Sequence, residues 1–276
     1  TALFNSAPRS KTLADLIDAG HTELVLHAIG TEDVLRTFLL FGEVLDHPFS
    51  EFDDPLYLTS NPTVQEGLTW SGVKYAFTHL SLSYWQPLTF LSHMLGWEWF
   101  GERPGGHHLI NLLLHMASSI LTFLALWRLT GAMWRSAAVA ALFAIHPLHV
   151  ETVAWLANRQ DALASVGWLL ALLAYAACAR QPSGLRYAAV AGAYALALMS
   201  KPSVVVLPAI LLILDWWPLG RSGWKRLVLE KAPLAAMSVP VMIAAYVAER
   251  TTGATELVKN LTAWDKFGNL VVSYAA

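Results

Sequence analysis

The run LINLLLHMASSILTFLALW, residues 109–127, decides the fold class. It contains no Asp, Glu, Lys or Arg, and an apolar stretch of about 20 residues is what a helix needs to cross a bilayer. Some of the other apolar runs are shorter, so we expect helices that are extended by flanking residues or buried against neighbours. These runs lie at about 136–145, 162–179, 187–200, 204–217, 233–248 and from 267 onward. The sequence therefore predicts an all-α, polytopic membrane helix bundle.

The composition supports a membrane protein and excludes several other classes. Of the 276 residues, 55% are hydrophobic and 14% charged, whereas soluble domains are about 25% charged. The net charge of −2 gives no reason to expect nucleic acid as a partner. The 12 Trp residues suit rings at membrane–water boundaries. A single cysteine, Cys178, excludes a disulfide framework or a cysteine metal site.

The N-terminal part is the hardest to assign. Residues 1–32 are polar, show no secretory signal and are left as a segment of uncertain structure, and residues 33–276 are assigned to one membrane domain. The apolar run 34–45 is short and contains Arg36 and Glu43, so it is a poor spanning helix. The chain begins without Met and stops within an apolar run, which we interpret as a piece of a longer protein.

A long loop, residues 46–106, precedes the first strong apolar run. Within it, residues 64–80 and 85–100 have helical spacing with one apolar side, as in helices that lie in the membrane interface. Lys and Arg concentrate in every second connection further along the chain, so the positive-inside rule assigns those connections to the cytoplasm. The basic residues are Arg128, Arg135, Arg180, Arg186, Arg221, Lys225, Arg226 and Lys231. By counting, the loop 46–106, the segment 146–161, Lys201 and the segment 249–266 share the outer face.

Two adjacent carboxylates, Asp53 and Asp54, stand in the stretch EFDDPLY, residues 51–57, of this loop. Adjacent carboxylates repel, which raises one pKa and prepares a group that can accept a proton in a transition state. The alternative is a solvated turn, because Asp-Asp-Pro is a good turn sequence. The residues alone leave both interpretations open.

Other polar residues stand out on the same predicted face, and one more, Asp215, stands near the inner end of its run. His108, Asn111 and His115 have i, i+3, i+7 spacing, and two His with one Asn favour a hydrogen-bonded stripe over a metal site. Asp215, next to Trp216 and Trp217, is interpreted as an interfacial cap. Between residues 146 and 161, His146, His149, Glu151, Arg159 and Asp161 form either a functional site or internal ion pairs. Lys201 either binds a phosphate or extends its amine to the membrane surface.

Several stretches together resemble one family. They are FDDPLY (52–57), NPTVQEGLTW (61–70), WQPLTFLSHML (85–95), GERPGGHHLINLLLH (101–115), LFAIHPLHVETVAWLANRQD (142–161), MSKPSVVVLPAILLILDWWPL (199–219) and LEKAPL (229–234). The chain is similar, from about Leu45 to its end, to bacterial relatives of the transmembrane and tetratricopeptide-repeat O-mannosyltransferases, a family of the GT-C class. Members of that family usually continue with further helices and a tetratricopeptide-repeat domain.

The resemblance implies a GT-C helix bundle in the plasma membrane, a polyprenyl-phosphate sugar as donor and chemistry on the outer face. It implies Asp53 as the catalytic residue, with Asp54 beside it, and Lys201 at the lipid phosphate. Arg159, His146 and His149 match family motif positions, and Glu151 and His108 complete the expected substrate-binding set. We expect no cofactor, and the ligand set for a divalent metal is thin. Gln86 departs from the pattern, because the family commonly has His at this position.

The function that follows is transfer of a mannose-like sugar from polyprenyl phosphate to an acceptor hydroxyl. The expected acceptor is Ser or Thr of a protein, with a glycan as the other possibility, and a single displacement would invert the anomeric centre. A carrier or flippase for a lipid-linked sugar is the alternative, since it would use the same cations to hold phosphate. A membrane scaffold is a third reading, in which mutation of these residues would have no effect.

Overall fold

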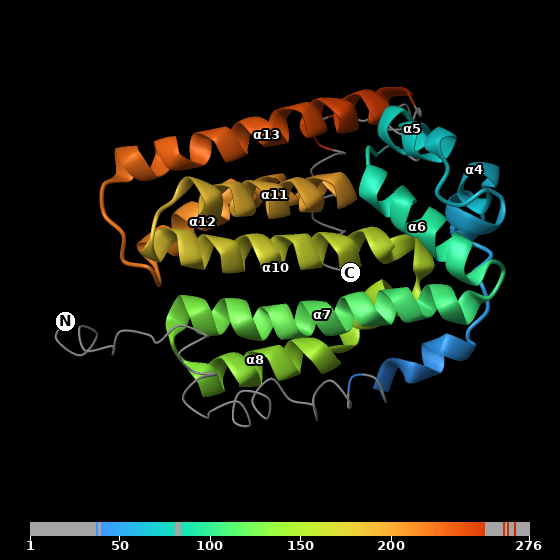
Figure 1. Ribbon diagram of the computed structural model, residues 1–276, viewed down its shortest axis with the longest axis horizontal. Coiled ribbons are helices and arrows are strands. Elements are labelled where there is room, and N and C mark those ends of the chain that lie inside the picture. Colours follow the sequence, from blue (N-terminus) through green and yellow to red (C-terminus); the bar gives the residue numbers. More distant parts are fainter. Residues whose placement is uncertain are drawn as a thin grey trace.

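The computed structural model describes residues 37, 40–80, 84–251, 262, 264 and 268, and every regular element in these ranges is helical (Figure 1). Within these ranges, three helices are long and apolar enough to cross a membrane, namely α7 (Pro104–Thr130), a helix over Leu156–Arg180 and one over Trp224–Ala248. A fourth span is formed if Met133–Ile145 and Pro147–Ala154, which meet at 51°, count as one. The predicted all-α membrane helix bundle is confirmed.

The remaining elements are short helices and turns around these spans. In chain order the elements are η1 (Gly42–Asp46), η2 (Pro55–Thr59), α4 (Pro62–Gln65), α5 (Trp70–Thr78), α6 (Pro87–Phe100), α7, α8 (Met133–Ile145), η3 (Pro147–His149), α9 (Val150–Ala154), η4 (Leu156–Asn158), α10 (Arg159–Arg180), α11 (Gly184–Ser200), η5 (Pro202–Val206), α12 (Leu207–Trp216) and α13 (Trp224–Thr251).

The helix boundaries follow from residues that start or stop helices. Pro87 and Pro104 begin α6 and α7, because proline fits the first helical position, where no N–H is needed. Thr69 caps α5 by accepting a hydrogen bond from the Gly72 N–H at 3.1 Å. Gly131 ends α7 with φ of +73°, a conformation that glycine adopts without strain.

Two of the predicted helices have different bounds. The run predicted over 64–80 is split into α4 and α5, because the chain turns at Gly67 with φ of +74°. The run predicted over 233–248 belongs to a helix that begins at Trp224 and continues through Pro233 and Pro240. Predictions for residues 1–32 and for nearly all of the run from 267 fall outside the described residues.

The bundle is built around α10, which lies between α7 and α11 (Figure 1). The core on the α11 side includes Tyr175, Tyr194, Leu207, Leu211 and Leu234, all at most 1% exposed. α10 and α11 approach closely at Gly167, where an added Cβ would lie 2.8 Å from the backbone nitrogen of Ala197. Small residues at such crossings are typical of helix packing in membranes.

Replacing Gly167 with Ala is expected to destabilise the protein by about 1–3 kcal/mol, since the new methyl group meets backbone that cannot move without separating the two helices. Thermal unfolding in detergent measures this change. Gly192→Ala in α11 is the matched control, because nothing lies within 4 Å of its added Cβ. Equal effects of the two substitutions would show that α10 and α11 do not pack at Gly167.

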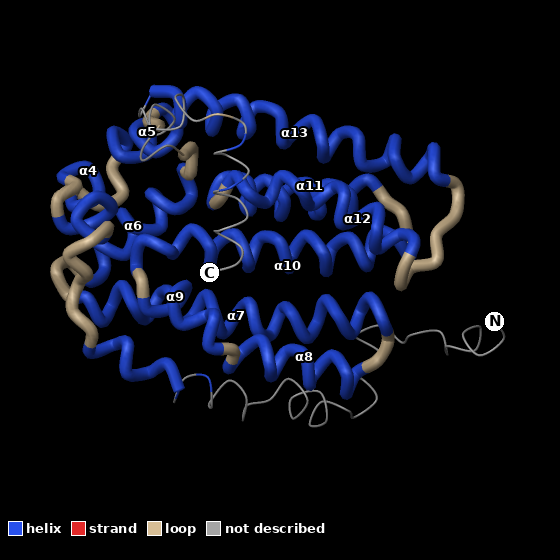
Figure 2. The backbone as a smooth tube through the Cα atoms, turned by 180° about the vertical axis from the view of Figure 1, so that it is seen from behind, coloured by secondary structure: helices blue, strands red, loops and turns tan. Residues whose placement is uncertain are grey.

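The chain direction alternates, so the connections sort into two groups at opposite ends of the bundle (Figures 1 and 2). One end holds the segment from η1 to α6, the turns from His146 to Asn158, and Lys201. The other end holds the turns 131–132, 181–183 and 217–223. These are the same two groups that the distribution of Lys and Arg separates, apart from the segment 249–266, most of which lies outside the described residues. Exposed Trp residues occur at both ends, as expected for two interfacial belts, among them Trp70 and Trp99 at the first and Trp134, Trp216 and Trp224 at the second.

Candidate functional site

Asp53 and Asp54 initiate a helical turn. Pro55 begins η2, and the carbonyl oxygen of Asp53 accepts hydrogen bonds from the N–H groups of Leu56 (3.0 Å) and Tyr57 (3.3 Å). The carboxylate of Asp54 accepts from the Ser50 N–H at 2.7 Å and so closes the turn before the helix. Asp-Asp-Pro therefore does form a turn, and that turn fixes the direction of both side chains.

The turn is held by α6. Tyr57 and Leu58 are buried, and the Tyr57 ring stacks on Phe90 of α6 with ring centres 5.8 Å apart. Gln86, just before α6, donates a hydrogen bond to the Tyr57 hydroxyl at 3.0 Å. Among the described residues, α6 is thus the element that supports the acidic pair. The sequence predicts a helix in the membrane interface for this part of the loop, and the structure shows a helix whose residues are mostly buried or half-buried.

The two carboxylates differ in environment. Asp54 is 1% exposed, and its burial raises its pKa, although the Ser50 N–H and the charge of Arg159 act in the opposite direction. One oxygen of Asp54, Oδ1, has no hydrogen-bond partner among the described residues. Asp53 is half-buried, and its carboxylate makes no hydrogen bond or ion pair within the described part of the chain. Asp53 is therefore the accessible and unengaged member of the pair.

A cleft of about 340 Å³ opens beside this turn. Asp54 and Glu151 bring two carboxyl groups to its walls, and the Glu151 carboxylate accepts a hydrogen bond from Asn158 at 3.0 Å. Nε1 of Trp155 is buried without an acceptor in the described structure. The full lining consists of His47, Pro48, Phe49, Ser50, Asp54, Val150, Glu151, Ala154 and Trp155. The sequence did not indicate His47, Phe49 or Trp155 as residues of this cleft, because nothing in their spacing links residues 47–49 to residue 155.

Arg159 lies behind the cleft and is completely buried. Its guanidinium donates hydrogen bonds to Asn111 Oδ1 (2.8 Å), the His107 carbonyl (2.9 Å) and the Ser92 carbonyl (3.2 Å). Gly96 makes room for it, since a Cβ there would lie 3.2 Å from Nη1. Arg159 thus joins α6, α7 and α10, and each of its three nitrogens donates a hydrogen bond within the protein.

Lys201 is the partly exposed cation at this end of the bundle. It forms an ion pair with Asp161, and the two side chains are 32% and 30% exposed. The preceding carbonyl, of Ser200, accepts a hydrogen bond from Thr89 of α6 at 3.2 Å. This hydrogen bond connects the residue before Lys201 to α6, the helix that supports the acidic pair.

The histidines take different positions. His149 is half-buried against His115 and Phe143, with ring centres 5.1 and 4.2 Å away, and His146 is exposed. His108 is buried, with its ring 6.3 Å from His47. Of the predicted site residues, only Asp54 and Glu151 line the cleft. Asp53 stands next to the lining residue Asp54 but is not part of the lining, and the others also lie outside it, namely His108, His146, His149, Arg159 and Lys201.

The stripe of His108, Asn111 and His115 is only partly hydrogen-bonded to neighbouring elements. Asn111 donates to the carbonyls of Thr152 (3.4 Å) and Trp155 (3.3 Å), and His115 bonds to the Ala144 carbonyl at 2.9 Å. Among the described residues, no three His, Cys, Asp or Glu side chains come together in a way that could hold a metal ion.

The interpretation of Asp215 as an interfacial cap is wrong. Asp215 is completely buried at the opposite end, where it accepts hydrogen bonds from Tyr175 (2.5 Å) and Arg221 (2.8 Å) and pairs with Lys231. Glu230 pairs with both Arg221 and Lys231. The two acids and two bases cancel in charge and join α10, α12 and α13. The one sequence feature that could have indicated this network is the adjacent pair Glu230 and Lys231 beside an apolar run.

Sequence comparisons connect this chain to animal proteins. It is 42% identical over 91 residues to protein O-mannosyl-transferase Tmtc1 of Drosophila melanogaster, which covers 33% of this chain and 11% of that protein. It is 34% identical over 146 residues to Tmtc2 of the same organism (50% and 16%) and 33% identical over 161 residues to TMTC2 of Homo sapiens (55% and 18%). No family model and no solved structure matches. The chain spans less than a fifth of the length of these relatives, and over a third to about half of its own length it is similar to proteins named as protein O-mannosyl-transferases.

Proposed function

We propose that the chain is part of a membrane glycosyltransferase that moves a mannose-like sugar from a polyprenyl-phosphate donor to a Ser or Thr hydroxyl of a protein. The observation that carries this proposal is the similarity to protein O-mannosyl-transferases. The half-buried, unengaged carboxylate of Asp53 beside a cleft gives the reaction a candidate base. The all-α bundle with its short helices at one end is consistent with a GT-C fold.

In this reaction the acceptor oxygen attacks the anomeric carbon, and its proton passes to Asp53. The bond from that carbon to the phosphate oxygen breaks, and polyprenyl phosphate leaves with the electron pair. A single displacement inverts the anomeric centre. Asp54 and Arg159 act as positioning residues, because both are buried and hold the turn and α6 in place.

The membrane orientation is part of the proposal. Arg128, Arg135, Arg180 and Arg186 lie at the end opposite Asp53, and by the positive-inside rule this supports a position of Asp53 on the outer face of the plasma membrane. A donor with a long polyprenyl tail would reach this end from within the bilayer.

The class of donor provides the test. The full-length protein in liposomes is incubated with a labelled acceptor peptide that contains Ser and Thr, and with either polyprenyl-phosphate mannose or a nucleotide-linked mannose. We expect glycosylated peptide with the lipid-linked donor only. Transfer from the nucleotide sugar, or from neither donor, would contradict the proposal.

Lys201→Gln is expected to raise the KM for the lipid-linked donor by roughly tenfold, since a charge-assisted contact to phosphate is lost. The KM and kcat are measured in the same liposome assay. Lys74→Gln, an exposed lysine of α5 at the same end, is the matched control and leaves the KM unchanged. An unchanged KM in Lys201→Gln would show that Lys201 does not contact the donor, and that its role is the ion pair with Asp161.

A further inference from the structure

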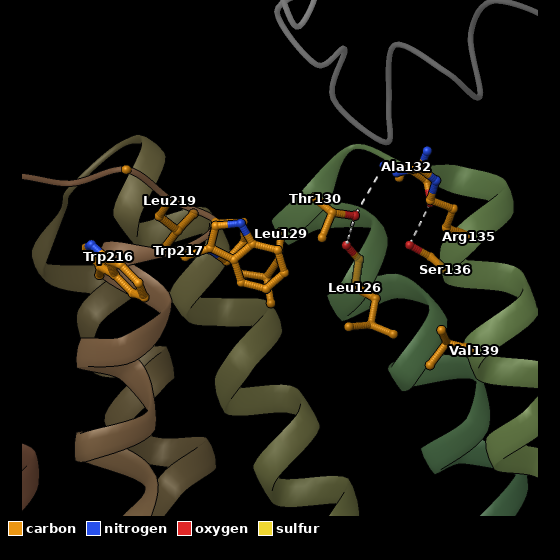
Figure 3. A pocket seen from close by; sticks show the side chains of 12 residues that line it. Leu126, Leu129, Thr130, Ala132, Arg135, Ser136, Val139, Trp216, Trp217 and Leu219 are labelled. Atoms are coloured by element: carbon orange, nitrogen blue, oxygen red, sulfur yellow. Dashed lines mark hydrogen bonds between the residues drawn. The ribbon is translucent and has the colours of Figure 1, made fainter. Parts of the chain in front are cut away.

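A second and larger cavity, of about 830 Å³, lies at the end of the bundle opposite Asp53 (Figure 3). Ligand-binding pockets range from about 300 to 1,000 Å³, so its size suits a ligand. Leu126 and Leu129 of α7 form its floor, Val139 of α8 forms one wall, and Trp217 and Leu219 form the other. The walls are apolar and come from α8 on one side and from the turn after α12 on the other.

The edge of this cavity carries a positive charge that no described residue pairs with. Arg135 lies at the start of α8, is exposed, and makes no hydrogen bond or ion pair within the described part of the chain. The nearby acids do not neutralise it, because Asp215 and Glu230 are paired with Arg221 and Lys231. The polar groups of Thr130 and Ser136 are occupied by the carbonyls of Leu126 and Ala132, at 2.7 and 2.8 Å (Figure 3).

The surroundings of the cavity are those of a membrane–water boundary. Trp134, Trp216 and Trp224 are exposed at this end, and rings of this type sit at the level of lipid headgroups. Val139 and Leu142 continue the apolar surface along α8 and are exposed to the surroundings of the bundle. A molecule in the cavity would therefore have its apolar part against the helices and its polar part beside Arg135.

We propose that this cavity binds one anionic glycerophospholipid, with an acyl chain between α8 and Trp217 and the headgroup phosphate on Arg135. An arginine fork matches phosphate in two hydrogen bonds, whereas a zwitterionic lipid would bring a second cation to an end already rich in Arg and Lys. The site lies at the opposite end from Asp53, so it is independent of the proposed sugar transfer.

Native mass spectrometry of the full-length protein tests this inference. The protein is released from micelles after incubation with equal amounts of phosphatidylglycerol and phosphatidylcholine of the same chain length. We expect preferential retention of one phosphatidylglycerol, and an affinity roughly tenfold lower in Arg135→Gln. Val139→Trp, which fills the cavity and keeps Arg135, is expected to reduce retention as well.

Arg186→Gln is the matched control, because it removes the same charge at the same end without lining the cavity. An equal loss in Arg135→Gln and Arg186→Gln would reduce the effect to general surface charge and overturn the inference. Equal retention of the two lipids would do the same. Inorganic phosphate at millimolar concentration is expected not to displace the lipid; displacement would assign the site to free phosphate.

Discussion

Replacing Asp53 with Asn is expected to lower the rate of sugar transfer by about 100- to 10,000-fold, the usual range for loss of a general base. The amide cannot accept the acceptor's proton, yet it has nearly the same shape as the carboxylate. The turn itself is expected to persist, because it depends on the backbone of Asp53, the side chain of Asp54 and the buried Tyr57 and Leu58. The kcat with saturating lipid-linked donor measures the effect.

Glu51→Gln is the matched control, since it makes the same change two residues earlier at an exposed position, whereas Asp53 is half-buried next to the cleft residue Asp54. We expect its kcat to stay within about twofold of the wild-type value, as for surface changes that remove no transition-state contact. A kcat for Asp53→Asn close to that of Glu51→Gln would exclude Asp53 as the base. Attention would then turn to Glu151, the exposed carboxylate that lines the cleft.

Replacing Asp215 with Asn is expected to destabilise the protein by about 3–5 kcal/mol, because it breaks a buried ion pair from one side. Lys231 is 2% exposed and would lose its closest carboxylate. Arg221 would keep its ion pair with Glu230 and its hydrogen bond to the Tyr175 hydroxyl. The midpoint of unfolding in detergent or lipid discs, followed by Trp fluorescence, measures the loss.

A double-mutant cycle separates the loss of pairing from a change of packing. Lys231→Met together with Asp215→Asn removes both charges, and we expect this double variant to be more stable than Asp215→Asn alone. Purely additive losses would show that Asp215 and Lys231 do not interact in the folded protein. Sugar transfer by the folded fraction is expected to be normal, since the network lies at the end opposite Asp53.

The helical bundle could be predicted because it depends on local patterns. The apolar run 109–127 lies within α7, and the grouping of connections at two ends follows from the alternating direction of successive helices. Helix ends were missed where a signal was ambiguous. Pro233 was taken as a start although the helix runs through it, and a turn at Gly67 splits a run with helical spacing.

The candidate site could be predicted only in part, because its members come from distant segments. Asp53, Asp54 and Glu151 stood out as charges in an apolar chain, and Asp54 and Glu151 do meet at one cleft. No pattern in the sequence indicates that Arg159 donates hydrogen bonds to Asn111, His107 and Ser92. Nor does any pattern indicate that Trp155 lines the same cleft as residues 47–50. Those relations depend on how α6, α7 and α10 pack.

The most direct test of the proposed function follows the labelled sugar in sealed vesicles that contain the full-length protein, polyprenyl-phosphate mannose and an acceptor peptide on the side of Asp53. The proposal predicts that the label becomes covalently attached to the peptide in wild-type vesicles and stays on the lipid in Asp53→Asn vesicles. Label that crosses the bilayer while still attached to the lipid, with none on the peptide, would contradict it and identify a carrier of lipid-linked sugar instead.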